Sequence, residues 1–154
     1  MVLSQSGLTE TVYNDFYIGE GADVVIVAGC GIHNCGDQKS EHDGIHRFFV
    51  GKNAKVKYVE KHYGDGDGKG QRILNPVTEV TMEEGSYMEM EMVQIKGVDS
   101  TKRTTVADLD KNAKLIVRER LLTHGSQDAE SSFVVNLNGE DSSADVVSRS
   151  VAKE

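Results

Sequence analysis

A short pattern of apolar and polar positions recurs five times along the chain. Each copy has an apolar strand end, a tight turn that finishes on a small residue, and a second strand in which apolar and polar residues alternate. The turns span residues 18–22, 50–54, 82–86, 109–113 and, in a looser form, 137–144. Their small residues recur every 27 to 32 positions, which is typical of a solenoid built from stacked coils.

The residue that precedes each small residue indicates the shape of the turn. It is Gly21, Asn53, Gly85, Asn112 and, in the looser copy, Ser143. Gly and Asn tolerate a positive φ better than other residues. Four of the five turns therefore carry the residue that a left-handed corner requires.

Apolar residues also occupy equivalent positions in successive copies. Alternation gives each strand one apolar face, and matching columns are expected when coils stack as parallel strands. The three predicted columns are Val24, Val56, Met88, Leu115 and Val146; Phe16, Phe48, Val80 and Ala107; and Ile18, Val50, Met82 and Leu109.

An antiparallel meander, in which each two-strand copy is a hairpin, is the alternative architecture. The matching register runs between copies rather than within each pair, and this favours the solenoid. No stretch of the chain shows a helical stripe of apolar residues, so we expect almost no helix.

The composition points to a single domain, 1–154, with a formal net charge of −8. An acidic surface disfavours nucleic acid and anionic membranes as partners. No apolar run approaches the roughly 18 residues of a spanning helix. The polar segment 1–10, which the sequence leaves open as a disordered tail, has no secretory pattern. Two cysteines supply no disulfide framework, so we expect a cytoplasmic protein with free thiols.

The concentrated chemistry lies where Cys30, His33 and Cys35 occur close together, followed by His42 and His46. Thiolates and imidazoles are ligands for zinc, iron or an iron–sulfur cluster, although this spacing matches no standard zinc module. The same segment is equally consistent with a structural interpretation, in which Cys30 is a small buried strand residue and the histidines lie in a solvated loop. His46 is expected to be a strand residue, because it lies two positions before Phe48.

Two other segments have simpler interpretations. The run Asp65–Gly70 cannot be a helix-flanked calcium loop, because its twelfth position is Pro76 rather than a bidentate Glu, and we expect a solvated, flexible loop. Met88, Met90 and Met92 alternate with glutamates and are expected to form a core face rather than a soft-metal site.

Several segments resemble, in order, the motifs of one known family. These are a strand ending in Gly-Cys, a His-bearing strand with the coil after it, an EEGAxME coil, an HQD turn and a final Ser-rich strand. The matching segments are Val27–Cys30, Glu41–Phe49 with Gly51–Tyr58, Asn75–Glu91, His124–Asp128 and Asp141–Ser150. From about Asn14 to Glu154, the chain thus resembles the central β-helix of the SufB/SufD family, the scaffold subunits of Suf-type iron–sulfur cluster assembly.

This resemblance implies an all-β, right-handed parallel β-helix of about five two-strand repeats. It also implies cytoplasmic cluster assembly, a dimer with a SufB/SufD-like partner or a second copy, and a SufC-like ATPase subunit as partner. Cys30 lies at the position of a family cysteine that accepts sulfur from a sulfur-donor protein as persulfide. A thiolate suits that role, and a nearby protonated histidine would lower the pKa of the thiol.

The chain departs from the family pattern in three ways. Gly31–Asn34 replaces the small residue and Ala-Pro that usually follow the cysteine, and Cys35 has no family counterpart that we can place. The chain also ends before the family's interface cysteine and carboxylate and its C-terminal helices. We therefore expect either a fragment or a reduced relative that lacks the C-terminal segment.

The sequence leads to a functional hypothesis with one main alternative. The hypothesis is a scaffold without enzymatic turnover that accepts sulfur at Cys30 and binds iron or a transient iron–sulfur cluster through Cys30, Cys35, His33 and His42. The alternative is a non-catalytic β-solenoid interaction module with structural cysteines and no cluster. A zinc hydrolase has the least support, because no acid–base residue has a convincing place.

Two further expectations concern reactivity and assembly. Flanking glycines leave the sulfur of Cys30 approachable, and His33 is expected to stabilise its thiolate, so Cys30 should react faster than Cys35. The strand at Ala144–Val151 is expected to pair across a two-fold axis, because it would otherwise expose an edge.

Overall fold

The computed structural model describes residues 1–154 and is built from strands and turns. No helix able to span a lipid bilayer is present. The twelve strands are β1 (Val2–Leu3), β2 (Thr9–Ile18), β3 (Asp23–His33), β4 (Ser40–Val50), β5 (Lys55–Asp65), β6 (Arg72–Leu74), β7 (Val77–Met82), β8 (Tyr87–Gln94), β9 (Ser100–Leu109), β10 (Lys114–His124), β11 (Asp128–Leu137) and β12 (Ser143–Lys153).

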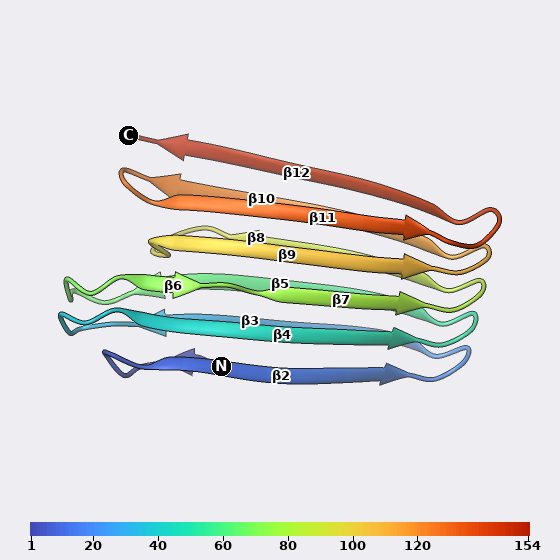
Figure 1. Ribbon diagram of the computed structural model, residues 1–154, viewed down its shortest axis with the longest axis horizontal. Coiled ribbons are helices and arrows are strands. Elements are labelled where there is room, and N and C mark those ends of the chain that lie inside the picture. The colour runs from blue at the N-terminus through green and yellow to red at the C-terminus, as the bar shows by residue number, and fades with distance from the viewer.

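The strands form two parallel sheets that face one another (Figure 1). One sheet has the order β1-β3-β5-β8-β10-β12, and the other has the order β11-β9-β6-β4-β2, with β7 also between β4 and β9. Each coil contributes one strand position to each sheet. In one coil this position is divided into β6 and β7, because Pro76 interrupts the strand between them. The predicted solenoid is confirmed, and the antiparallel meander is wrong.

The register between coils matches the predicted columns through the first four coils. On the first strands, Phe16 pairs with Phe48, which pairs with Val80. On the second strands, Val24 pairs with Val56, and Met88 follows in the next coil. Equivalent apolar side chains therefore stack directly on one another between the two sheets.

The left-handed corners also lie where the sequence predicts them in these coils. The φ angles are 66° at Gly21, 56° at Asn53, 71° at Gly85 and 56° at Asn112. Each corner amide donates a hydrogen bond to a carbonyl of the following coil, as in the 2.8 Å bond from Gly21 to Lys52. The corners therefore both reverse the chain and connect neighbouring coils.

The last coil departs from the predicted register. Leu115 pairs with Ala144, whereas Val146 pairs with Val117, two positions further along the strand. The prediction that Val146 continues the column of Leu115 is therefore wrong.

The cause lies in the last turn. Its positive φ of 59° occurs at Asp141, two residues before the predicted Ser143. Aspartate shares with asparagine a tolerance of the left-handed region, so the corner forms earlier. The turn also has one residue more than the turn before it, and Gly139 is packed so closely that an added Cβ would lie 1.9 Å from the amide nitrogen of Lys111.

The core between the sheets is a continuous apolar cluster that includes Met88, Met90 and Met92, all fully buried. The predicted core face of methionines is therefore confirmed. Val56 is buried while the adjacent Lys55 is exposed, as alternation requires. Residues 1–10, left open as a disordered tail, instead contribute β1 and the beginning of β2.

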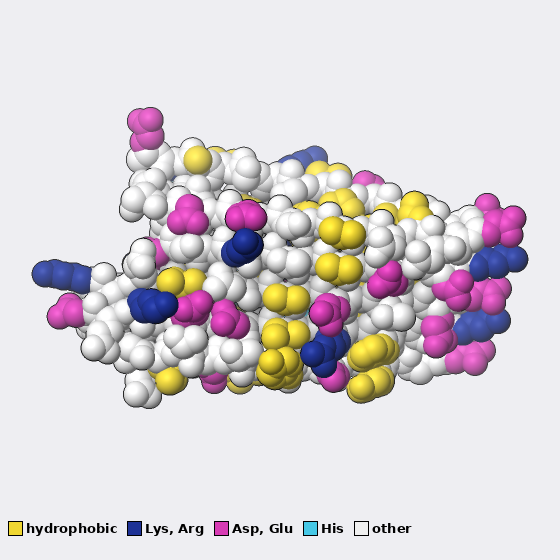
Figure 2. All heavy atoms as spheres, viewed as in Figure 1, with side chains coloured by type: hydrophobic (Ala, Val, Ile, Leu, Met, Phe, Trp, Pro, Cys, Tyr) yellow, Lys and Arg dark blue, Asp and Glu magenta, His cyan; other side chains and the backbone are white.

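The outer face of the sheet that contains β2, β4, β7, β9 and β11 is mixed in character. Figure 2 shows short columns of apolar side chains there, interspersed with acidic and basic ones. The most exposed aromatic pair is Tyr17 and Phe49, whose rings stack with centroids 4.7 Å apart. At the far end of the solenoid, the side chains of β12 are almost entirely exposed.

Candidate functional site

The predicted sulfur and metal residues lie in two separate places. Cys30 is on β3 and its side chain is buried, with 7% of its surface exposed, whereas Cys35 follows the strand and is exposed. His42 is buried on β4, and His33 is the last residue of β3. No group of three or more Cys, His, Asp or Glu side chains is arranged to hold a metal ion.

Cys30 lines a cavity of about 250 Å³ near the first coil, together with Phe16, His42 and His46. His46 is a buried residue of β4, as the sequence predicts. Burial, together with the negative charge of Glu60, raises the pKa of the Cys30 thiol to about 11. The expectation that a neighbouring histidine lowers this pKa is therefore wrong, and Cys30 is protonated at neutral pH.

His42 is oriented by a carboxylate on the neighbouring coil. Its Nδ1 lies 3.1 Å from Oε2 of Glu10, so Nδ1 carries the hydrogen that the carboxylate accepts. Its Nε2 is buried and has no hydrogen-bond partner. In the neutral ring this nitrogen carries a lone pair, and a buried lone pair without a partner suits a ligand.

A buried polar network extends from this region into the solenoid. Arg103 on β9 donates from Nη1 to Oε2 of Glu60 at 2.5 Å and from Nη2 to Nδ1 of His62 at 3.0 Å. The Nε of Arg103 lies 3.1 Å from Oε1 of Glu119. Arg103, Glu60 and Glu119 are all at most 1% exposed, so one guanidinium is held between two buried carboxylates.

Glu60 is also connected to the first coils. Tyr58 donates its hydroxyl to Oε1 of Glu60 at 2.9 Å and accepts a bond from Nδ1 of His46 at 2.7 Å. Burial alone would raise the pKa of Glu60, but His62, Arg103 and His46, whose Nδ1 lies 3.4 Å from Oε1 of Glu60, hold that pKa well below its usual range. Glu60 is therefore ionised inside the protein. The sequence prediction missed this network.

His33 contacts the second cysteine rather than the first. Its Nε2 lies 3.0 Å from Sγ of Cys35, and its Nδ1 lies 2.7 Å from Oδ1 of Asp65. His33 and Asp65 are direct neighbours in the register of β3 and β5, where each is the last residue of its strand. The expectation that His33 stabilises a thiolate at Cys30 is therefore wrong.

The turn that carries Cys35 is held by its neighbours. Asn34 is fully buried and its Nδ2 donates to the carbonyl of Gln38 at 2.8 Å, while its Oδ1 accepts from the amide of Gly36 at 3.0 Å. The glycine-rich loop of the next coil packs against this turn through backbone bonds from Gly68 to Asn34 and from Gly70 to Gly36.

Close packing explains the glycines of that loop. A Cβ on Gly68 would lie 2.3 Å from the carbonyl oxygen of Gly36, and one on Gly70 would lie 2.0 Å from that of Gln38. The segment expected to be a solvated, flexible loop is therefore packed against the Cys35 turn, backbone against backbone.

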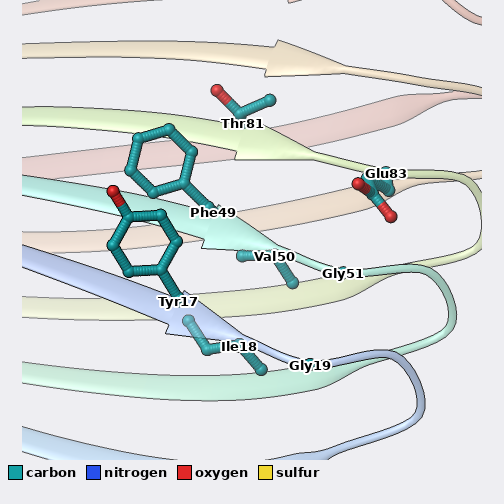
Figure 3. Close-up of a pocket in the computed structure, with 8 residues that line it drawn as sticks. All are labelled: Tyr17, Ile18, Gly19, Phe49, Val50, Gly51, Thr81 and Glu83. Atoms are coloured by element: carbon teal, nitrogen blue, oxygen red, sulfur yellow. The ribbon is translucent and has the colours of Figure 1, made fainter.

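A second cavity lies at the opposite end of the strands and has no such chemistry. It has a volume of about 330 Å³ and is lined by Tyr17, Phe49, Thr81 and Glu83, among others (Figure 3). None of its lining residues is a cysteine or a histidine. The candidate site is therefore the region around Cys30, Cys35 and the three histidines near them.

Fold and site together define a parallel β-helical protein with a charged interior and two free thiols near the ends of its first coils. Residues 5–154 match the family model described as the SufBD core domain of SUF system FeS cluster assembly. The chain belongs to the SufBD family, as the sequence motifs indicate.

A curated relative supports this assignment. The chain is 27% identical over 144 residues to an iron-sulfur cluster assembly SufBD family protein of Archaeoglobus fulgidus. The alignment covers 94% of this chain but only 37% of that relative, so the chain spans little more than a third of the relative's length. No solved structure matches the chain.

Proposed function

We propose that this chain is a scaffold for iron–sulfur cluster assembly, without turnover of its own, and that the cavity beside Cys30 holds sulfur and iron in transit. The observation that carries the proposal is the pairing, in one cavity, of a buried thiol with the unpartnered Nε2 of His42. Both are ligands for iron, and the family membership of the chain supports the same assignment.

The environment of Cys30 suits a positively charged cargo. A thiol with a pKa of about 11 is a poor nucleophile at neutral pH, because little of it is thiolate. A metal cation replaces the proton and compensates the same desolvation that raises this pKa. The carboxylate of Glu10 holds the His42 ring so that Nε2 is the free ligand atom.

The proposal also includes interaction partners, which we infer from the family membership of the chain. They are a SufC-like ATPase, a SufB/SufD-like partner or a second copy of the chain, and a sulfur-donor protein, acting together in the cytoplasm. In this proposal the cluster is a cargo that is passed on rather than a permanent cofactor. His33 and Cys35 lie outside the cavity and are not needed to hold the cluster there.

One observation favours the alternative, an interaction module with a structural cysteine. Cys30 belongs to a small apolar cluster with Leu3, Ile32, Leu74 and Val98, in which a buried thiol needs no other role. The two functions differ in whether the cavity binds iron.

Anaerobic reconstitution tests this directly. The chain, with and without a co-expressed SufC-like ATPase, is supplied with ferrous iron and inorganic sulfide, and bound iron and acid-labile sulfide are measured. We expect Cys30→Ser and His42→Gln to lose most of the bound iron, while Cys35→Ser, outside the cavity, retains it. Equal iron in all four proteins, or none in the wild type under either condition, would refute the scaffold and support the structural alternative.

A further inference from the structure

We infer that Cys35, His33 and Asp65 form a second thiol site, at which Cys35 accepts sulfane sulfur from a persulfide donor in solution. The inference rests on the proposed function, which requires that sulfur reach the protein, and it names the residue where sulfur first binds. It reverses the order of reactivity that the sequence suggests for the two cysteines.

The geometry is that of an activated nucleophile. Sγ of Cys35 lies 3.0 Å from Nε2 of His33, within reach of direct proton transfer. Nδ1 of His33 lies 2.7 Å from Oδ1 of Asp65, which can only accept, so the hydrogen of the neutral ring is on Nδ1. Nε2 therefore presents its lone pair to the thiol. A nucleophile, a base and a group that orients the base are thus in line.

The fold holds these three groups in place. His33 and Asp65 are adjacent because β3 and β5 stack in register, the same register that aligns the core. Cys35 lies in the turn that Asn34 braces and that the glycine-rich loop supports from the next coil. A site built from a strand end and a braced turn loses little entropy when it reacts.

Access distinguishes this thiol from Cys30. Cys35 is exposed, and the side chains of His33 and Asp65 are 47% and 51% exposed, so all three groups are accessible from solvent. Cys30 is 7% exposed and its pKa is raised by burial. A large donor that carries its persulfide at an active site can therefore reach Cys35 without entering the solenoid.

The step is a sulfur exchange in which atoms and electrons balance. His33 Nε2 takes the proton from Cys35, and the thiolate attacks the terminal sulfur of the donor R–S–SH. A new S–S bond forms at Cys35, the donor's S–S bond breaks, and its thiolate leaves. The proton passes from His33 to that thiolate, so the products are Cys35–S–SH and R–SH, with no external oxidant or reductant.

The surroundings favour sulfur exchange over acyl transfer. Acyl transfer needs amide donors for a developing oxyanion. The amide that follows the nucleophile, at Gly36, is already bonded to Oδ1 of Asn34. An exchange between sulfurs develops no oxyanion and needs no such donors.

Short exposure to glutathione persulfide under anaerobic conditions tests the inference. The reaction is quenched with an alkylating agent, and added sulfur is mapped by mass spectrometry. We expect the first sulfur atom on Cys35, full loading in Cys30→Ser and none in Cys35→Ser. At pH 7, His33→Gln should slow loading roughly tenfold or more, since an unassisted thiol is only a few per cent thiolate there. His124→Gln, which changes an exposed histidine elsewhere, should load like the wild type.

The role of Asp65 is tested by the loading rate at pH 7. Asp65→Asn should slow the loading of Cys35 toward the rate of His33→Gln, because the His33 ring then loses the carboxylate that orients it. Asp65→Glu should restore part of the rate. First loading on Cys30, or equal loading in Cys35→Ser and wild type, would overturn the inference. Reconstitution with inorganic sulfide bypasses this thiol, so the proposed function would stand or fall separately.

Discussion

Replacement of Arg103 by methionine should be among the most destabilising single changes in this protein. Arg103 lies 2.5 Å from Glu60 and 3.1 Å from Glu119, and the three side chains are at most 1% exposed. Methionine keeps most of the volume but leaves two buried carboxylates without their cation. Removal of one partner from a buried pair costs about 3–5 kcal/mol.

Two features determine where in that range the loss should fall. Glu119 keeps hydrogen bonds from Ser131 at 2.9 Å and Ser148 at 2.6 Å, and Glu60 keeps the bond from Tyr58. These bonds moderate the penalty, so we expect about 3–4 kcal/mol at pH 7. A small domain has only about 5–15 kcal/mol in total, so the variant should be marginally stable.

The effect of pH follows from the sign of the shift at Glu60. Its pKa in the folded protein is lowered, so it contributes stability above its unfolded pKa, and that contribution is lost as the pH falls through the folded pKa. In Arg103→Met one cause of the lowering is absent, and the carboxylate is protonated at higher pH. The difference in stability between wild type and variant should therefore shrink as the pH falls from the pKa of Glu60 in the folded variant to its lower pKa in the folded wild type.

The assay is urea unfolding followed by circular dichroism at pH 7 and at the lowest pH where both proteins fold. The control is Arg118→Met, on the outer face, where the 2.6 Å ion pair with Asp145 is largely exposed and should be worth less than about 1 kcal/mol. If Arg103→Met does not fold, Arg103→Lys keeps the charge and should show a smaller loss. Equal losses in Arg103→Met and Arg118→Met would refute the interpretation of the network.

Three other predictions concern the register, the corners and the open edge. Val56→Asp should cost several kcal/mol because it buries an unpaired carboxylate, while Lys55→Asp on the other face should cost little; similar losses in denaturant would contradict the register. Asn112→Val should cost about 1–2 kcal/mol at a φ of 56°, whereas Asn112→Gly should be tolerated; a thermal melt that ranks them otherwise would be evidence against the strained corner. The exposed strand at Ala144–Val151 should mediate dimer formation, and a concentration-independent monomer in sedimentation would exclude this.

Much of the fold was predictable because its signals are local. Alternation of apolar and polar residues depends only on the period of a strand, and a corner with positive φ needs Gly, Asn or Asp at one position. Both signals repeat with the coil, so Phe16, Phe48 and Val80 could be aligned without coordinates. The prediction failed in the last coil because the corner forms at Asp141, two residues before the predicted Ser143, so the strand that follows is shifted by two positions.

The sequence contained part of the information needed to predict the polar interior. Glu60 and His62 continue the inward phase that begins at Val56, and Arg103 and Glu119 are also at inward positions. A count of polar residues in that phase would have indicated a charged interior. The partners could not be predicted, because Arg103 reaches residues 41 and 43 positions away in sequence.

The sequence by itself determined the repeat, the direction of stacking, most corners and the presence of two thiols among several histidines. Only the tertiary structure decided the environment of each thiol. Cys30 and Cys35 are only five residues apart. Even so, Cys30 is buried within the strand, whereas Cys35 follows the end of the strand and is exposed to solvent. His33 contacts both Cys35 and Asp65 because the end of β3 lies beside the end of β5, and desolvation of Cys30 comes from strands that the local sequence does not contain.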